Sequence, residues 1–430
     1  MASNTRDPGP PQSFLTPSQI FWYSLANFGY GTFFSLNNAL IAPFLSNFTK
    51  NAILMGLMGS THSFEGAIIQ PLVGTASDRL RHPFGKRRPF ILLFTPLSAL
   101  FLALTPAATH LPSPIRLSLL VLLIFLSTVL FNIAYDPYQA LMPDITPEPQ
   151  RGRVTAIWSL FGLFGQATIL LMPGDYTTKF LLSAALMIVL AVLTCMMIPE
   201  PSPLDAPEGD IETPSFKQQL VRALRGLRVL RQARLGLLGF FFAGLGIGAV
   251  LPLLTEFVIH ITHCTANRAA QMFLILMAST ALAVVPAGQI ADRVLTPKKT
   301  LLVGFSLIFI ACLCGLRVTT LTQIAWVMGL AGIGNAALSA SSYPLLADIV
   351  PPEEVGFYVG LQSTAASLAQ PLTIVITGAL VNHGSYRVIF LVCALCILAA
   401  LLSIALLRPS AAKQEIQQHR ALAELKLSDI

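Results

Sequence analysis

Long apolar stretches alternate with short polar segments along the whole chain. A helix that crosses a bilayer needs about 20 mainly apolar residues, and twelve stretches meet that need. We therefore predict an all-α integral membrane protein with spans near residues 18–45, 52–78, 89–109, 115–143, 153–173, 178–199, 234–260, 267–292, 299–318, 321–347, 355–381 and 386–407.

Charge is scarce, and its placement predicts the orientation of the chain. Only 11% of the residues are charged and the mean hydropathy is +0.70, whereas a soluble domain carries about 25% charged residues. The net charge is +7, and most cations lie in the polar segments after the second, fourth, sixth and eighth stretches. Because cytoplasmic loops are rich in Lys and Arg, we expect these segments and both termini to be cytoplasmic, in a plasma (inner) membrane. Topology accounts for the positive charge, so we expect no nucleic-acid partner.

The longest polar segment divides the chain into two parts. Residues 1–199 are predicted to form an N-terminal six-helix bundle, and residues 234–430 a C-terminal six-helix bundle with a cytoplasmic tail. Residues 200–233 form the cytoplasmic central loop between them. Its second part, FKQQLVRALRGLRVLRQAR, alternates Leu or Val with Arg at helical spacing, which predicts an amphipathic basic helix on an anionic membrane face.

The two parts repeat each other in sequence. PLVGTASDR at residues 71–79 has a counterpart in PAGQIADR at residues 286–293. Three later pairs keep one common separation: Asp144 with Asp348, Gly152 with Gly356, and Gln166 with Gln370. Parallel repeats of six spans are a transporter architecture.

No sequence pattern predicts an enzyme or a metal site. Five of the six cysteines lie in apolar runs, and the Cys393–Cys396 pair has no second pair or nearby His to complete a metal site. A phosphate-binding glycine loop and a Ser/His/Asp constellation are also missing from the sequence. The polar, Pro-rich first 17 residues predict no cleavable signal. We expect a monomer without cofactors, in a lipid bilayer, that uses an ion gradient for accumulation.

One charged segment carries a family resemblance. GTASDRLRHPFGKRRPF, residues 74–90, resembles the signature of the major facilitator superfamily, and GQIADR at 288–293 repeats its first part. Its long form and FGYGTFFSLNNALIAPFL in the first span are similar to the sucrose/proton branch of the glycoside–pentoside–hexuronide:cation symporter group. PYQALMPDITP is similar to the wider group. The resemblance implies two pseudo-symmetric six-helix bundles, alternating access, and symport of a sugar with protons. It covers most of the N-terminal half, while the C-terminal half matches only at superfamily level.

The charges at the cytoplasmic helix ends are candidates for a latch. A network of carboxylates and cations at this rim can form in one conformer and break in another, and glycine in a span permits close helix approach. The alternative is that these charges only fix the topology. The candidate latch residues are Gly74, Asp78, Arg79, Gly85, Lys86, Arg87, Arg88, Asp144, Arg151, Arg153, Asp292 and Arg293.

Ionisable residues inside spans are candidates for proton coupling, because they are costly there and are functional by default. Glu65 is placed near mid-membrane, with His62 one turn away on the same helix. Asp136 lies in the fourth span, and Glu256 near the outer end of the seventh is a candidate for an outer gate. The alternative for each carboxyl is a satisfied structural hydrogen bond.

Amides and aromatic side chains are candidates for sugar binding. An amide can bind a hydroxyl but cannot carry a proton at neutral pH, and its alternative role is helix packing. The amide candidates are Asn37, Asn38, Gln166, Asn335, Gln362 and Gln370. The first span also holds Trp22, Tyr23, Phe28, Tyr30, Phe33 and Phe34, which we expect to face lipid or the interface, with a sugar-stacking platform as the alternative.

These observations favour a proton-coupled sugar or glycoside symporter. The first alternative is an exporter or carrier of another small amphipathic solute. The second is a membrane scaffold without transport, which leaves Glu65 and Asp136 unexplained.

Overall fold

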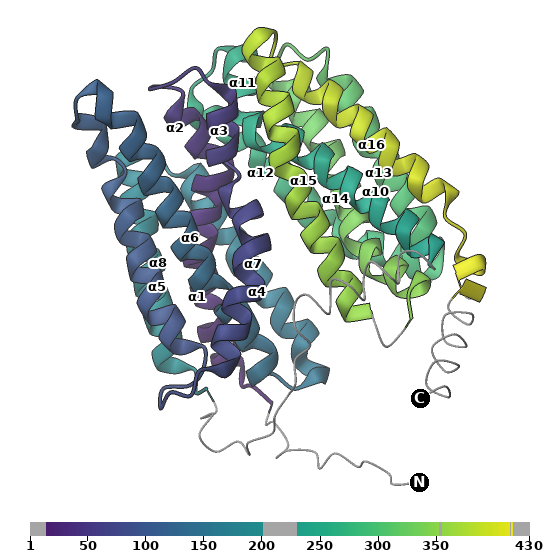
Figure 1. The fold of residues 1–430 in the computed structure, drawn as a ribbon, viewed down its shortest axis with the longest axis horizontal. Helices are drawn as coiled ribbons and strands as arrows, with labels where there is room; N and C mark the ends of the chain where they lie inside the picture. Colours follow the sequence, from purple (N-terminus) through teal and green to yellow (C-terminus); the bar gives the residue numbers. More distant parts are fainter. Residues whose placement is uncertain (1–13, 201–229, 352–354, 413, 416–430) are drawn as a thin grey trace, which may run out of the picture. The chain divides into compact units, whose positions relative to one another are not determined.

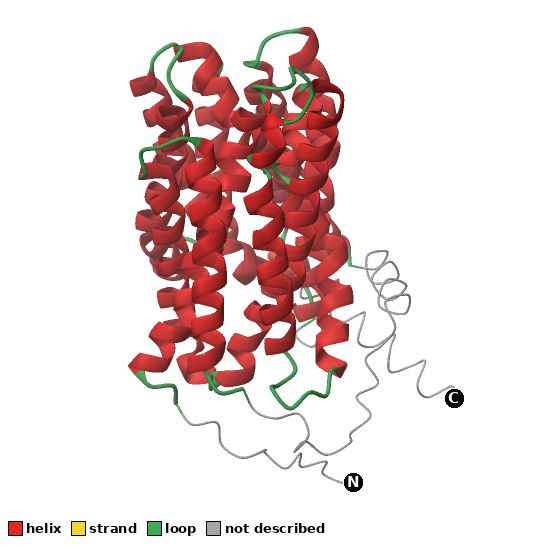
Figure 2. Ribbon diagram, turned by 90° about the vertical axis from the view of Figure 1, so that its left-hand side faces the viewer, coloured by secondary structure: helices red, strands yellow, loops and turns green. Residues whose placement is uncertain are grey.

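The part of the chain that the structure describes is helical throughout. The computed structural model describes residues 14–200, 230–351, 355–412 and 414–415, without the side chains of 62–68, 71, 148, 292, 356 and 357. Every regular element in these ranges is a helix (Figure 2). The expected all-α fold is confirmed.

Ten helical segments are long and apolar enough to cross a membrane, counted over the described residues. They correspond to the third through twelfth expected spans. The first two expected spans are helical as well, but each is divided: one by a π-helical turn at Leu36–Leu40, the other by a turn at Gly59–Ser60. The polar residues Asn37 and Asn38 lie in the π-helical turn, a feature that is frequent at functional sites.

The chain separates into two compact units. The first consists of residues 1–36 and 68–208, and the second of residues 37–67 and 209–430. The domain boundaries expected from the sequence, at residues 199 and 234, stay a prediction, and the basic amphipathic helix expected before residue 234 falls mostly outside the described residues.

The helices of the first unit come from the N-terminal half of the chain, coloured purple to blue in Figure 1. They are α1 (Pro17–Ser35), the C-terminal part of α4 (Thr61–Arg79), α5 (Arg88–Leu104), η2 (Ala107–His110), α6 (Ser113–Ile145), η3 (Glu148–Gln150), α7 (Arg151–Leu171) and α8 (Tyr176–Met197). Within this unit α1 packs against α7 and α8, and α5 packs against α6 and α8.

Small residues bring α1 and α7 into backbone contact. A Cβ at Gly31 would overlap the Gly162 carbonyl oxygen, and a Cβ at Gly165 would overlap the Phe28 carbonyl oxygen. Close approach of this kind is how helices associate in lipid, where burial of apolar surface supplies little driving force between them.

The second unit contains the remaining helices. They are η1 (Leu36–Leu40), α2 (Ile41–Leu45), α3 (Ala52–Met58), α10 (Arg231–Val250), η5 (Leu251–Leu253), α11 (Leu254–Thr262), α12 (Ala266–Arg293), α13 (Pro297–Gly315), α14 (Leu321–Ile349), α15 (Val355–His383) and α16 (Val388–Leu406). Here α14 packs against α12 and α13, and α10 packs against α15 and α16.

The sequence repeat has a structural counterpart at the ends of α6 and α14. Asp144 and Asp348 occupy the same place in their helices, one residue before the last. The first residue after each helix, Thr146 or Val350, has an extended backbone that ends the helix in both cases.

Candidate solute and coupling site

A charged cluster lies where three helices of the first unit begin or end. Arg87, just before α5, reaches between Asp78 near the end of α4 and Asp144 near the end of α6. Its Nε lies 3.1 Å from Asp144 Oδ2, and its terminal nitrogens contact Asp78 and the Ser77 hydroxyl. Lys86 Nζ lies 3.1 Å from the same Asp144 oxygen. The structure therefore brings together four of the predicted latch residues.

This cluster combines a buried cation with carboxylates that water can reach. The Arg87 side chain is 6% exposed, whereas those of Asp78 and Asp144 are 58% and 25% exposed. All its members belong to the first unit, so here the network ties α4, α5 and α6 together. A role as a latch between transport states stays a prediction.

Glu200, which the sequence reasoning missed, completes the cluster. Its carboxylate accepts hydrogen bonds from the backbone N–H groups of Lys86, Arg87 and Arg88, at 2.9, 2.8 and 3.1 Å. These donors lie at the start of α5, where N–H groups lack partners within the helix and the helix dipole favours negative charge. The signal in the sequence was an acidic residue directly after the sixth span.

Gly85 makes room for this interaction. Its φ is 99°, a conformation that side-chain-bearing residues rarely adopt. A Cβ at this position would overlap the Glu200 carboxylate. The glycine of the charged motif is thus required by the backbone turn and by the close approach of Glu200.

The other latch candidates have different surroundings. Arg151 donates to the carbonyl oxygens of Thr146 and Pro143, and so covers the end of α6. Side chains of Arg79, Arg153 and Arg293 are exposed, and that of Asp292 lies outside the described residues. A Cβ at Gly74 would meet no described atom within 4 Å, so the close helix approach expected there stays a prediction.

Asp136 presents a carboxyl group inside the first unit. It lies on α6, one oxygen is buried without a hydrogen-bond partner among the described residues, and Gln70 from α4 is a partner of the carboxyl. An unpaired buried polar atom is costly, which favours a role in binding or proton transfer.

The aromatic residues of the first span form a packed cluster beside Asp136. Tyr23, Tyr30 and Phe33 are almost fully buried, so the expectation that they face lipid is wrong for these three. The Tyr30 ring packs against Phe131 and Tyr135 on α6, with ring centroids 5.6 and 5.4 Å apart. These rings are buried because α6 packs against them. The apolar pattern of one helix does not show which helix covers it.

Asn37 is the most unusual amide candidate. It lies in the π-helical turn η1, it is 1% exposed, and neither its Oδ1 nor its Nδ2 has a hydrogen-bond partner among the described residues. Buried amides normally have hydrogen-bond partners. Helix packing through amide hydrogen bonds therefore does not account for this side chain. The next residue, Asn38, is half-buried.

Glu256 occupies a buried position in the second unit. It lies in the first turn of α11, is 7% exposed, and has Ser46 as a hydrogen-bond partner and one oxygen without a partner in the described chain. Burial, and after it the neighbouring Glu256 carboxyl, raise the pKa of Tyr386 to about 12. The Tyr386 phenol therefore stays protonated and able to donate a hydrogen bond at neutral pH.

The remaining candidates are less constrained. Gln166, Gln362, Gln370 and Asn335 are half-buried on α7, α15 and α14, and Asn335 lines a cavity of the second unit. The side chains of His62 and Glu65 lie outside the described residues, although both belong to α4. The described part of the chain contains no group of three His, Cys, Asp or Glu that could hold a metal ion.

Comparison with known families identifies the architecture. A family model described as Major Facilitator Superfamily matches the chain twice, over residues 23–238 and 236–428. The two matches agree with the internal repeat.

Curated relatives are distant and mostly align over part of the chain. The human membrane-associated transporter protein is 28% identical over 175 residues, which is 37% of this chain and 33% of that protein. An uncharacterized MFS-type transporter of Bacillus subtilis, YxiO, is 25% identical over 364 residues, 80% of this chain and 82% of its own length. The mouse proton-associated sugar transporter A is 35% identical over 83 residues, 18% of this chain and 11% of that protein. The chain thus aligns with about a third of the human relative.

Solved structures share the fold. A nucleoside transporter, NupG, superimposes with a TM-score of 0.71 at 11% identity, covering 90% of this chain and 99% of that one. A D-xylose-proton symporter superimposes with a TM-score of 0.64 at 16% identity, covering 91% and 97%.

Proposed function

Since the chain belongs to the Major Facilitator Superfamily, we propose that this multi-pass transporter carries a sugar or glycoside together with protons. The observation that carries the proposal is the Asp136 carboxyl, which is placed inside a span with one oxygen buried and unpaired in the described chain. A group of this kind is suited to gain a proton on one side of the membrane and lose it on the other.

The choice of a sugar rests on the relatives and on the amides. One distant relative is a proton-associated sugar transporter, and one structure of the same fold is a D-xylose-proton symporter. Asn37 offers an amide oxygen and an amide nitrogen that have no partners in the described chain, and this pair of groups suits the donor and acceptor character of a hydroxyl. These points support the proposal over an exporter or carrier of another small amphipathic solute.

Coupling in this proposal follows from the cost of a charge in the membrane. An ionised carboxyl is costly in a span, so sugar binds more favourably beside a protonated Asp136. Symport results when sugar and proton bind together before the carrier changes state and both leave before the empty carrier returns. The charged cluster of Asp78, Lys86, Arg87 and Asp144, with Glu200, holds the cytoplasmic ends of α4, α5 and α6 in one arrangement. Its rearrangement is the expected latch step.

The orientation belongs to the proposal as well. We place the basic loops, and therefore the charged cluster, on the cytoplasmic side of the plasma membrane with both termini. The chain acts as a monomer without a cofactor, and the coupling ion is H⁺.

Uptake of labelled disaccharides into proteoliposomes tests this function. With the lumen alkaline relative to the outside, accumulation above the external concentration is expected, and it should collapse to equilibration when a protonophore is added. Uptake that never exceeds equilibration, with or without the pH gradient, would contradict proton coupling. Absence of any uptake for a panel of mono- and disaccharides would contradict the sugar assignment.

A further inference from the structure

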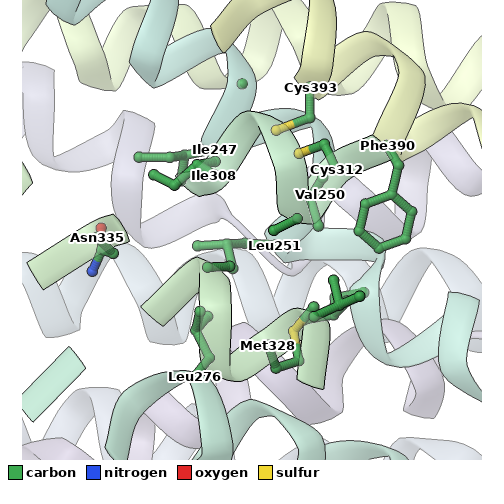
Figure 3. Close-up of a pocket in the computed structure, with 15 residues that line it drawn as sticks. Ile247, Val250, Leu251, Leu276, Ile308, Cys312, Met328, Asn335, Phe390 and Cys393 are labelled. Atoms are coloured by element: carbon green, nitrogen blue, oxygen red, sulfur yellow. The ribbon is translucent and has the colours of Figure 1, made fainter. Parts of the chain in front are cut away.

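A cavity of about 110 Å³ lies within the second unit. Its wall is built by η5 and by the helices α10, α11, α12, α13, α14 and α16, and all its lining residues come from the C-terminal part of the chain (Figure 3). Buried side chains such as Phe390, Met328 and Leu254 form much of the wall. The proposed sugar and proton sites do not account for this space, apart from Asn335 on the wall.

The wall is unsuited to water. Asn335 is the one lining residue with an amide or other strongly polar side chain, whereas a buried water needs about two to four polar partners. The other lining groups are aliphatic carbons, one phenyl ring and three sulfur atoms. A wall of this chemistry favours an apolar ligand over water.

The sulfur atoms favour an aromatic ligand over an aliphatic one. The thiols of Cys312 and Cys393 lie near each other on one side of the cavity, Phe390 lies beside them, and the Met328 thioether also faces the space (Figure 3). Sulfur makes favourable contacts with the edges of aromatic rings, and a phenyl ring offers an edge-to-face partner. An engineered apolar cavity of roughly 150 Å³ binds benzene. The smaller volume here, about 110 Å³, limits the ligand to a single ring.

We propose that this cavity is a binding site for a small aromatic group, a single six-membered ring or one of similar size. The ring lies between the sulfur atoms of α13, α14 and α16 and the apolar residues of α10. The site is independent of the sugar assignment, because it requires only the cavity and its wall.

Occupancy has a consequence for the break in the seventh span. Val250 at the end of α10, Leu251 in η5 and Leu254 at the start of α11 all line the cavity. A ring in contact with all three holds the two helical segments in one arrangement. Local opening of this segment should therefore become rarer when the site is filled.

Binding of fluorobenzene to the full chain in lipid nanodiscs tests the proposal, observed by ¹⁹F NMR against empty nanodiscs. Saturable binding is expected in addition to the linear partition into lipid. Fluorocyclohexane should bind at least threefold more weakly, since it lacks the aromatic edge. If fluorobenzene shows only linear partition, or if the two probes bind equally, the aromatic site does not exist.

Two cysteines on the same helix provide a matched pair of variants. Cys312 is buried on the wall, whereas Cys314 is exposed and does not line the cavity. Cys312→Leu, which fills part of the space, should weaken fluorobenzene binding at least tenfold, and Cys314→Leu should leave it within twofold of the parent. Ala331→Leu fills the cavity from α14 and serves if Cys312→Leu does not fold. Equal binding by the parent and a folded filling variant would overturn the proposal.

Hydrogen exchange supplies a second readout. Saturating fluorobenzene should slow amide exchange around Leu251–Leu254 several-fold in the parent and in Cys314→Leu, but not in the filling variants. Unchanged exchange in the parent at saturation would overturn the contact with the helix break. Failure of sugar uptake with ring binding intact would overturn the proposed function alone.

Discussion

Asp136 carries a carboxyl oxygen that finds no partner among the described residues, although the same group has Gln70 as a neighbour. Asp136→Asn keeps the shape of the side chain but removes its ability to gain or lose a proton. We expect this variant to lose accumulation of sugar driven by a pH gradient, by at least tenfold, while exchange of labelled for unlabelled sugar continues. Uptake and exchange assays in proteoliposomes measure the two activities separately.

Asp175→Asn is the matched control for this substitution. Asp175 is an exposed N-cap of α8, where the Thr178 hydroxyl and backbone N–H lower the pKa of its carboxyl. Asn also caps helices well, so accumulation should be unchanged. Normal accumulation by Asp136→Asn would remove Asp136 from coupling and leave Glu65→Gln as the next variant to examine.

Asn37 allows stability and binding to be separated. Replacing a buried, unsatisfied amide by an apolar group of similar size removes the cost of the unpaired atoms. Asn37→Leu should therefore raise the free energy of unfolding by about 1 kcal/mol, seen as a higher melting temperature, and should lose sugar binding. Asn27→Leu is the contrasting variant, since Asn27 Nδ2 donates to the Trp158 carbonyl oxygen at 2.8 Å, and it should lower stability. A destabilised Asn37→Leu would show that the amide has a structural partner.

The sequence indicated which residues were candidates, but not the burial or the hydrogen-bond partners of their side chains. The sequence identified Asp136 and Asn37 because polar groups inside an apolar stretch are conspicuous. It missed Glu200, since the partners of that carboxylate are backbone N–H groups at positions 86–88, and backbone donors leave no pattern in the sequence. Burial of Tyr23, Tyr30 and Phe33 depends on α6 and was equally invisible.

At the scale of elements, the start of α5 depends on Gly85. Gly85→Ala places a Cβ against the Glu200 carboxylate in a backbone conformation with φ at 99°. Strain and the displaced hydrogen bonds together should lower the free energy of unfolding by about 3 kcal/mol. Gly174→Ala separates the two effects, because φ there is 134° but a Cβ would meet only Thr178, at an ordinary 3.7 Å. Equal destabilisation by the two variants in a thermal unfolding assay would contradict the role of Glu200.

The charged cluster predicts a ranking of two further variants. Arg87→Leu leaves Asp78 and Asp144 without their shared cation, and because both carboxylates reach water the loss should be about 2 kcal/mol. Asp78→Ala leaves Arg87 paired with Asp144, so its cost in stability should be smaller, under about 1 kcal/mol. If the cluster is a latch, Asp78→Ala also increases the labelling of cysteines placed in the cytoplasmic half of the solute pathway. Identical stability of the parent and Arg87→Leu would contradict the ionic network.

Hydropathy correctly predicted the positions of those helices that run without a break. Ten expected spans match long apolar helical segments in the described chain. Among them α6 is one helix, although Pro137 and Pro143 lie inside it, whereas the seventh is broken at Leu251–Leu253. The π-helical turn at Leu36–Leu40 and the turn before Thr61 were not predicted. A sequence of apolar residues does not show where the backbone hydrogen bonds of a helix change partner. The packing contact expected at Gly74 stays a prediction, since no described atom lies within 4 Å of a Cβ there.

For the whole molecule, the sequence repeat was the strongest guide. The paired motifs implied two related six-helix parts, and the family model indeed matches the chain twice. The repeat does not identify the solute or the ion, because those depend on a few side chains within a common fold. Residues such as Glu65, whose side chain lies outside the described part of the chain, remain hypotheses from their position in a span.

The measurement closest to the central claim is proton movement caused by sugar. Proteoliposomes that contain a pH-sensitive dye, with no imposed gradient and with the membrane potential clamped by K⁺ and valinomycin, receive a transported sugar on the outside. Symport predicts acidification of the lumen that begins with sugar entry, is present in Asp175→Asn and is absent in Asp136→Asn. Sugar entry at the parent rate with no change of luminal pH would contradict the account.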